Sequence, residues 1–404
     1  MSHLCPLPWV GFSNDPYGTV KPCCINKDYV VKEDGSYFYV QNDTVKEIFH
    51  SKHMKDLRTE FLNGDKPKGC ETCWKDEENG YKSKREIYVD ILKNYEIDVD
   101  YNVVPEYPAD YQIILNNSCN LKCRSCSPSH STSWLKEINN IPTEDVVKIG
   151  VQHFGLKHGQ PGRLDSEFLN SIDDWLPHVR RIEIVGGEPF YSSTWEKVLT
   201  HIIERGNSKN IFLNMSTNAT ILNEDLLVKM SENFKSVGIG LSIDGTGETF
   251  EYLRKNASWS IVKNNLLTYH DYNKKYYGKL NFNYTHTTSW VNAYELPETF
   301  AWGRENTPLF KFWLNIIHYP EHMAIYMLPK IEKDRIKAKW DLFDWDEQKN
   351  DINALIEFMY SKQPSDEELK NNYIKFMVLD GYRGESTLEI VQKNYPSLFE
   401  YFKI

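Results

Sequence analysis

The stretch Asn116–His130, NNSCNLKCRSCSPSH, decides how the rest of the chain is interpreted. It places Cys119, Cys123 and Cys126 at the spacing C-x3-C-x2-C, directly after alternating apolar residues that predict a strand over 112–115. Three thiolates on one short loop leave a tetrahedral zinc site one ligand short. They can hold three irons of a cubane 4Fe–4S cluster and leave the fourth iron open to a second molecule. The loop therefore predicts a reactive iron site at the end of a strand.

The composition is typical of a folded protein from a reducing compartment. The 404 residues are 40% hydrophobic, 14% aromatic and 26% charged, enough for two or three globular domains. No apolar run and no basic, apolar leader stands out, so we expect no membrane helix, no signal peptide and a cytoplasmic location. The net charge of −10 argues against broad binding to nucleic acid or anionic membranes. All eight cysteines precede residue 127, which favours metal or catalytic thiols over disulfides.

The middle of the chain alternates short apolar strands with amphipathic helices. This series predicts an α/β fold, a partial (β/α)6 TIM-like barrel over about 105–320, with its chemistry at the carboxyl ends of the strands. The expected strands are 112–115, 181–185, 211–216, 237–243, 280–286 and 312–317, and the expected helices are about 164–176, 192–205, 222–233, 258–271 and 292–304.

Short polar motifs follow several of these strands. Two glycines after the second strand let backbone approach a ligand closely, and a glutamate there can accept hydrogen bonds from an ammonium group. Short polar side chains after the third strand suit ribose hydroxyls, and an arginine after the fourth can clamp a carboxylate. Each motif alone also fits a turn, a helix cap or a surface ion pair. Together they predict one binding site, made by Gly186, Gly187, Glu188, Pro189, Ser216, Asn218, Ser242, Asp244 and Arg254.

Residues 1–90 form a separate, cysteine-rich pattern. The turn at 15–18 between two short extended runs predicts a β-hairpin that brings Cys5 close to Cys23, and a helix is expected over 43–63. A C-x2-C knuckle, Cys70 and Cys73, completes a set of four possible ligands. On spacing alone, this set fits either a structural zinc or a second iron–sulfur cluster, and the neighbouring Cys24 is interpreted as a spectator.

Residues 321–404 predict a helical region that flanks or covers the barrel. Amphipathic helices are expected over 329–360 and 365–379, followed by a turn at 380–384. The aromatic residues of this region are interpreted as packing residues. His318 and His322 are four residues apart, but Pro320 lies between them and argues against a metal site.

The chain from 111 to about 320 resembles the core of radical S-adenosylmethionine (SAM) enzymes. The resemblance implies that the three cysteines of the loop hold a 4Fe–4S cluster whose open iron binds the amino and carboxylate groups of SAM. It assigns Gly186 to Pro189 to the methionine amino group, Ser216 and Asn218 to the ribose, and Ser242 and Arg254 to the carboxylate end. Asp244 would serve ribose or substrate. Many members carry an aromatic residue near the adenine, just before the third cysteine, where this chain has Ser125.

Residues 5–74 resemble the twitch or SPASM domain of the same enzymes. The motif appears as Cys5, twelve residues, Gly18, four residues and Cys23, with Cys70 and Cys73 as the later pair. The resemblance implies an auxiliary 4Fe–4S cluster with four protein ligands. In family members this module is expected after the barrel, whereas here it precedes the barrel.

The function implied by these resemblances is reductive cleavage of SAM to a 5′-deoxyadenosyl radical that abstracts hydrogen from a peptide or small-molecule substrate. The auxiliary cluster would assist oxidation or bond formation, and a flavodoxin or ferredoxin would supply electrons. Tyr284 and His286 share one face of the fifth expected strand and are the candidates for substrate contact inside the barrel. The alternatives are a non-catalytic binding protein with zinc at the N-terminal cysteines, and a radical enzyme acting on RNA, which the acidic composition disfavours.

Overall fold

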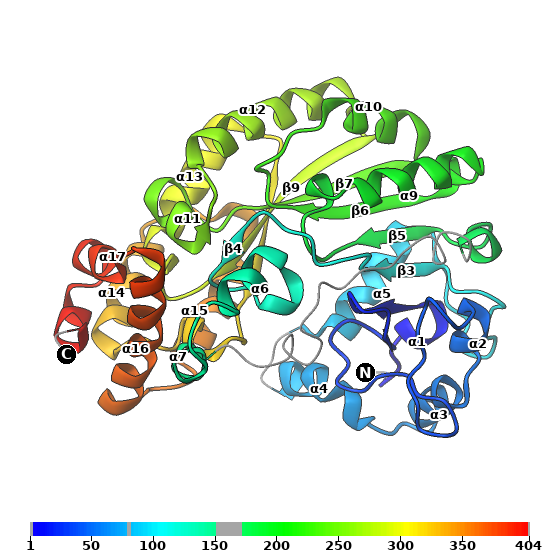
Figure 1. The fold of residues 1–404 in the computed structure, drawn as a ribbon, viewed down its shortest axis with the longest axis horizontal. Coiled ribbons are helices and arrows are strands. Elements are labelled where there is room, and N and C mark those ends of the chain that lie inside the picture. The colour runs from blue at the N-terminus through cyan, green and yellow to red at the C-terminus, as the bar shows by residue number, and fades with distance from the viewer. Residues whose placement is uncertain (1–2, 79–81, 151–171, 403–404) are drawn as a thin grey trace.

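The computed structural model describes residues 3–78, 82–150 and 172–402, and its centre is one open sheet (Figure 1). In this part of the chain the sheet has eight strands in the order β10-β9-β7-β6-β5-β3-β1-β2. All neighbours from β10 to β1 pair in parallel, which confirms the predicted α/β class and the partial barrel. The strands that match the six predicted ones are β3 (Asp110–Ile113), β5 (Arg181–Ile184), β6 (Phe212–Thr217), β7 (Ser236–Ser242), β9 (Leu280–Thr288) and β10 (Lys311–Ile316).

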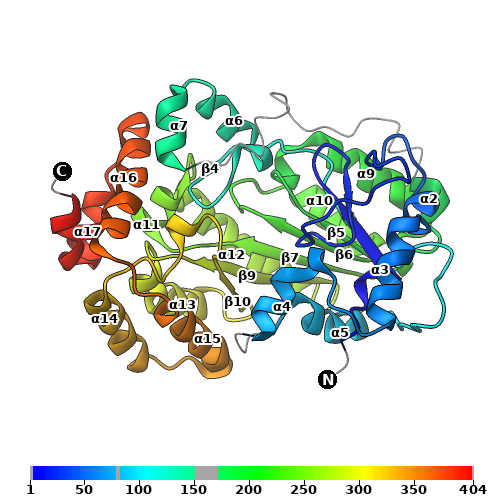
Figure 2. The same ribbon diagram turned by 90° about the horizontal axis from the view of Figure 1, so that it is seen from below.

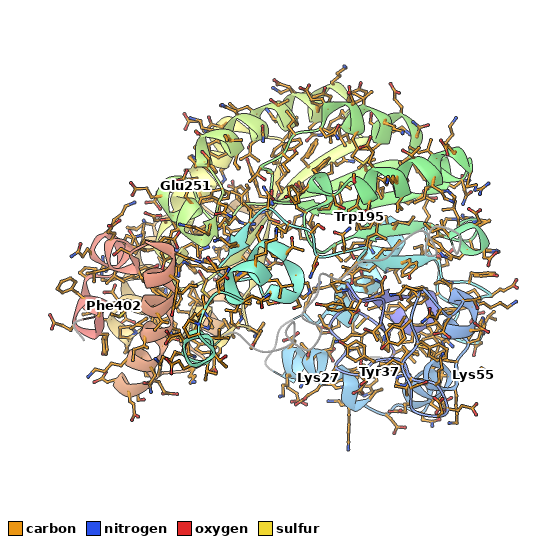
Figure 3. All side chains as sticks on the ribbon, in the orientation of Figure 1. Lys27, Tyr37, Lys55, Trp195, Glu251 and Phe402 are labelled. Carbon is orange, nitrogen blue, oxygen red and sulfur yellow. The ribbon has the colours of Figure 1, made fainter. Side chains whose placement is uncertain are left out.

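Helices cover the outer face of this sheet (Figures 1 and 2). They are α9 (Ser193–Glu204), α10 (Glu224–Asn233), α12 (Trp259–Lys275) and α13 (Leu296–Asn306). The predicted helix over 164–176 lies largely outside the described residues. Apolar side chains alternate along each strand, so that Val237, Ile239 and Leu241 of β7 are fully buried beneath the helices. Trp195 of α9 is buried in the same core (Figure 3).

The inner face of the sheet is polar and only partly buried. The alternate positions of β9 carry Asn281, Asn283, Thr285 and Thr287, all of intermediate exposure. Paired residues of parallel strands point to the same side, and Thr285 pairs with Ser242 of β7. The open side of the barrel is therefore lined by hydrogen-bonding side chains rather than by a packed apolar core.

The N-terminal module joins the barrel sheet directly. β1 (Gly11–Asn14) and β2 (Val20–Lys21) form the predicted hairpin, and β1 also pairs in parallel with β3. The predicted helix over 43–63 is two helices, because Ser51 breaks the run and caps the second one. A second apolar core, which includes Trp9, Phe61 and Trp74, holds the module together. Its helices are α1 (Leu7–Val10), α2 (Val45–Phe49), α3 (Lys52–Leu62), α4 (Glu71–Glu78) and α5 (Lys84–Asn94).

The C-terminal region is helical, as predicted, but its boundaries differ. The expected helix over 329–360 is two helices, α14 (Lys330–Asp341) and α15 (Lys349–Tyr360). The predicted turn at 380–384 is wrong, because α16 (Asp366–Arg383) continues through it and ends at Gly384, whose φ is 61°. A last helix, α17 (Thr387–Asn394), follows. In the described residues, no helix is long and apolar enough to span a bilayer.

Candidate functional site

The three-cysteine loop lies at the carboxyl end of β3, where the barrel geometry predicts the chemistry. Cys119 is buried, and Cys123 and Cys126 are half-buried. Burial raises the pKa of Cys119 and of Cys126 to about 12 and also raises that of Cys123. Buried thiols with such pKa values become thiolates only when a cation compensates their charge, and a bound metal does this. The donor set of this loop therefore fits a metal cluster.

A short antiparallel ribbon places an arginine opposite one of these cysteines. β4 (Lys122–Cys123) pairs with β8 (Arg254–Lys255), so that Cys123 faces Arg254. The Arg254 Nη1 atom lies 3.9 Å from Cys123 Sγ. The buried Nε atom of Arg254 has no hydrogen-bond partner among the described residues. This spare donor next to the cysteines suits a carboxylate ligand, the role that the resemblance implied.

Asp244 orients this arginine. One of its carboxylate oxygens lies 2.7 Å from Arg254 Nη2, and the other accepts a hydrogen bond of 2.9 Å from the backbone of Thr287. Both oxygens are therefore engaged with the protein. The geometry makes Asp244 a partner of Arg254 rather than a free ligand for ribose or substrate.

The Gly-Gly-Glu-Pro motif packs against the cysteine loop. Gly187 has a φ of 59°, and a Cβ atom there would lie 2.5 Å from the carbonyl oxygen of Ser118. Glu188 donates its backbone N–H to that same oxygen over 2.7 Å. Gly186 also has a positive φ and lies tightly against Ile114. The two glycines thus allow close approach of one loop to another, and Pro189 is buried behind them.

Glu188 is fully enclosed by protein donors. Its carboxylate accepts hydrogen bonds from Thr217 Oγ1 (2.7 Å), the Asn218 backbone (2.6 Å) and the Phe190 backbone (3.1 Å). Burial nevertheless raises the pKa of Glu188 to about 7, against the opposing effect of these donors. The residue joins the end of β6 to the cysteine loop.

The remaining cofactor candidates surround the same strand ends. The Asn218 side chain lies 4.0 Å from Cys119 Sγ and donates to Asn120 Oδ1 over 2.9 Å. Ser216 is exposed at the end of β6, and Ser242 is half-buried at the end of β7. Ser125 is half-buried in the cysteine loop. The structure therefore brings the predicted set to one end of the sheet.

Tyr284 and His286 differ from the prediction. They lie on the helix-covered face of β9, with exposures of 1% and 0%. The Tyr284 hydroxyl lies 2.6 Å from Thr307 Oγ1, and burial lowers the pKa of His286 to about 4. Their neighbours Thr285 and Thr287 occupy the inner face instead. The expectation that Tyr284 and His286 point into the barrel is therefore corrected.

The four N-terminal cysteines gather around one cavity. Cys5, Cys23, Cys70 and Cys73 line it together with Arg85, and its volume is about 20 Å³. Burial, reinforced by the neighbouring cysteines, raises the pKa of Cys70 to about 12. The Asn26 side chain lies 3.5 Å from Cys70 Sγ. The chain thus supplies four soft ligands around one small cavity.

The spacing of these thiols bears on the choice between zinc and a cluster. In the described ranges, no three His, Cys, Asp or Glu side chains are grouped tightly enough to hold one metal ion. A tetrahedral zinc site would need its thiolates about 3.8 Å apart, because each zinc–sulfur bond is about 2.3 Å long. Thiolates on separate corners of a cubane lie farther apart. Four cysteines can supply either geometry, so this ligand set suits a four-ligand cluster as well as a zinc ion.

A second small cavity lies beside the four-cysteine site and shares Cys23 and Lys84 with it. It is lined by Cys23, Cys24 and Lys84 on one side and by Ser13 and Gln112 of the sheet on the other. The Lys84 Nζ atom lies 2.8 Å from Cys24 Sγ. Sequence reasoning missed Lys84, whose only visible signal was a lysine at the start of an amphipathic helix.

Known proteins match this chain in two places. The model of the radical SAM superfamily matches residues 113–286, and the model of the SPASM iron-sulfur cluster-binding domain matches residues 5–74. No curated protein matches the chain.

Several solved structures are distantly similar. One is anSMEcpe with bound AdoMet, at 19% identity, a TM-score of 0.38 and coverage of 61% of this chain and 60% of that one. Another is Streptococcus suis SuiB bound to precursor peptide SuiA, at 13% identity, a TM-score of 0.35 and coverage of 78% and 65%. The chain thus spans less than two thirds of the length of these proteins.

Proposed function

Because the chain belongs to the radical SAM superfamily and carries a SPASM domain before its barrel, we propose that it is a radical SAM enzyme acting on a peptide or small molecule. The observation that carries the proposal is the ribbon that sets Arg254 against Cys123 at the carboxyl ends of the strands. Cys119, Cys123 and Cys126 would hold the SAM-binding 4Fe–4S cluster. When bound, the cluster and SAM supply a 5′-deoxyadenosyl radical that removes hydrogen from the substrate.

The protein's own groups would bind and orient the two reactants. Arg254, held by Asp244, offers charge-assisted hydrogen bonds to the carboxylate of SAM. The partly exposed inner face would receive the substrate through side chains such as Asn283 and Thr285. These side chains favour a substrate with hydrogen-bonding groups near the reacting carbon.

The SPASM module would hold the auxiliary cluster through Cys5, Cys23, Cys70 and Cys73. Cys23 lines both the four-cysteine cavity and a second cavity bordered by Ser13 and Gln112 of the sheet, and this closeness supports a role in accepting an electron from the substrate. Such a role favours net oxidation or bond formation. A low-potential protein such as flavodoxin or ferredoxin would supply the reducing electron.

Anaerobic reconstitution tests the proposal. The protein should bind about eight irons and eight sulfides, and the reduced protein should convert SAM to 5′-deoxyadenosine. The Cys123→Ala variant is the matched control and should form none. If the wild type also forms none with any candidate substrate, the alternative of a metal-stabilised binding protein is favoured. If the protein instead binds about four irons and one tightly held zinc ion, the N-terminal cysteines hold a structural zinc and not an auxiliary cluster.

A further inference from the structure

A buried arginine inside the cysteine loop binds the C-terminal region. Arg124 lies between Cys123 and Cys126, and its side chain is only 1% exposed. Its Nη2 atom pairs with Asp380, near the end of α16, and lies 2.6 Å from Glu385 Oε2. The two partners are more than 250 positions away in the sequence. The loop expected to hold the SAM-binding cluster is therefore attached to the far end of the chain.

A compact network surrounds this ion pair, although the buried Nη1 atom of Arg124 has no hydrogen-bond partner among the described residues. The guanidinium of Arg124 stacks on the Tyr252 ring, 3.8 Å from its centre. The second oxygen of Asp380 accepts hydrogen bonds from the Thr387 backbone (2.5 Å) and hydroxyl (2.6 Å). The Tyr252 hydroxyl in turn contacts the Thr387 hydroxyl. A buried charge held this way fixes one position of Arg124, since any other leaves charge unpaired.

A second contact fixes the backbone of the loop at Cys123. Arg383, also near the end of α16, lies 2.7 Å from Glu137, which is 2.6 Å from Lys122 as well. Arg383 also stacks over the Trp134 ring at 4.6 Å. The indole N–H of Trp134 donates to the Cys123 carbonyl oxygen over 2.7 Å. These contacts come from α6 (Thr132–Ile138) and α16 together.

A third contact reaches the other strand of the ribbon. Lys255 lies 3.0 Å from Glu385 and donates to the carbonyl oxygen of Arg383 over 3.2 Å. Lys255 directly follows Arg254 and pairs with Lys122 across the ribbon. The same short segment thus holds both the cysteine strand and the arginine strand. Figure 2 shows α16 beside α7 (Thr143–Ile149), on the side of the molecule where β4 lies.

We propose that residues 380–387 are a positioning segment for the SAM-binding cluster, with Asp380 and Glu385 as its positioning residues. The segment sets Cys123 and Arg254 at their mutual distance through Arg124 and Lys255. The C-terminal region is then a part of the cofactor site rather than only a cover of the barrel. The proposal rests on a cluster at Cys119, Cys123 and Cys126, and it does not depend on the substrate or on the role of the SPASM domain.

The test compares Asp380→Asn and Glu385→Gln with the control Glu332→Gln. Glu332 is a buried carboxylate of α14 that accepts hydrogen bonds from Ser397 and contacts none of the cysteine loop. We expect Asp380→Asn to weaken SAM binding by about 10- to 100-fold and to alter the SAM-dependent EPR signal of the reduced cluster. In the metal-free protein, Asp380→Asn should raise the rate at which Cys126 is alkylated, compared with the wild type. Glu332→Gln should lower only the melting temperature.

The outcomes separate the possible failures. Asp380→Glu should restore the EPR signal and SAM affinity at least in part, because it returns the carboxylate. If Asp380→Asn unfolds, Glu385→Gln carries the same comparison, since Glu385 is less buried. Equal EPR signals, SAM affinity and alkylation rates in Glu385→Gln, Asp380→Asn and Glu332→Gln would overturn the proposal. If the wild-type protein holds no iron–sulfur cluster that the Cys126→Ala substitution removes, the cofactor assignment and the proposed function are overturned instead.

Discussion

The two cysteine sites differ in how the protein holds them. The four-cysteine site would take all its ligands from residues 5–73, within one module that has its own apolar core. The three-cysteine loop is held by segments from the whole chain, namely the Gly-Gly-Glu-Pro motif, the Arg254 strand and residues 380–387. Four ligands can close a cluster and fix its place, whereas three leave a position open for a cofactor. The geometry of the open site should therefore depend on contacts from more of the chain than the geometry of the closed site does.

Removing one ligand of the open site should have the largest effect. Cys126→Ala should lower the iron content from about eight to about four per chain and abolish 5′-deoxyadenosine formation, because two cysteines cannot retain the cubane. Iron and sulfide analysis, with chromatography of the nucleoside products, measures both. The auxiliary iron should stay bound, since its ligands lie in another module. A variant that keeps eight irons and full SAM cleavage would show that Cys126 is not a ligand of the SAM-binding cluster.

Removing one ligand of the closed site should separate two activities. Cys73→Ala should also lose about four irons, but it should still cleave SAM, because the cysteine loop has no ligand from the module. Formation of the oxidised product should fall by about 100-fold or more, since the electron acceptor is lost. Mass spectrometry of the substrate and quantification of 5′-deoxyadenosine in one reaction distinguish these effects. Loss of both activities together would show that the open site depends on the module.

The sequence predicted the six barrel strands because their alternation of apolar and other residues is regular, as in β7 and β9. Alternation shows that a strand has two faces, but it does not say which face is inside. In this open barrel the inner face is polar, so Thr285 and Thr287 face inward, and the aromatic Tyr284 packs against Phe312 in the outer core. The prediction chose the apolar face, which is the inner one only when a barrel is closed and packed.

The contacts that hold the open site were beyond sequence reasoning for another reason. Arg124 and Asp380 carry no local pattern that links them, because their pairing depends on how α16 folds back onto the cysteine loop. Glu188 was predicted to face a ligand, but three protein donors surround it. The motifs at strand ends were predictable, since parallel strands bring their carboxyl ends together. The orientation of each side chain within the site was not.

Glu188 makes the free energy of unfolding depend on pH. Burial raises its pKa to about 7, while an unfolded glutamate has a pKa of about 4.3. Between these values the folded protein keeps a proton that the unfolded chain loses, so this residue lowers stability as pH rises from about 4.3 to 7. The full cost above pH 7 is about 4 kcal/mol, since each pKa unit corresponds to about 1.4 kcal/mol. Glu188→Gln should remove this slope in urea unfolding of the metal-free protein, measured at pH 5 and pH 8.

The matched control for that experiment is a glutamate outside the site. Glu295 is partly buried and bound to Lys393 and Thr249, and its pKa is lowered rather than raised. Glu295→Gln should therefore leave the slope from Glu188 in place. If wild type and Glu188→Gln lose the same free energy of unfolding between pH 5 and pH 8, the raised pKa of Glu188 is refuted.

The smallest effect is expected at Cys24, and this substitution tests whether Cys23 or Cys24 belongs to the four-cysteine site. Cys24 is exposed and pairs with Lys84 over 2.8 Å, whereas Cys23 lines the four-cysteine cavity. Cys24→Ser keeps a hydrogen-bonding atom for Lys84, so the free energy of unfolding should change by less than about 0.5 kcal/mol. The variant should bind about eight irons, and its neighbour Cys23→Ser should bind about four. The reverse result would show that Cys24 is the ligand, which would place the auxiliary cluster nearer the cavity that Cys24 lines together with Ser13 and Gln112.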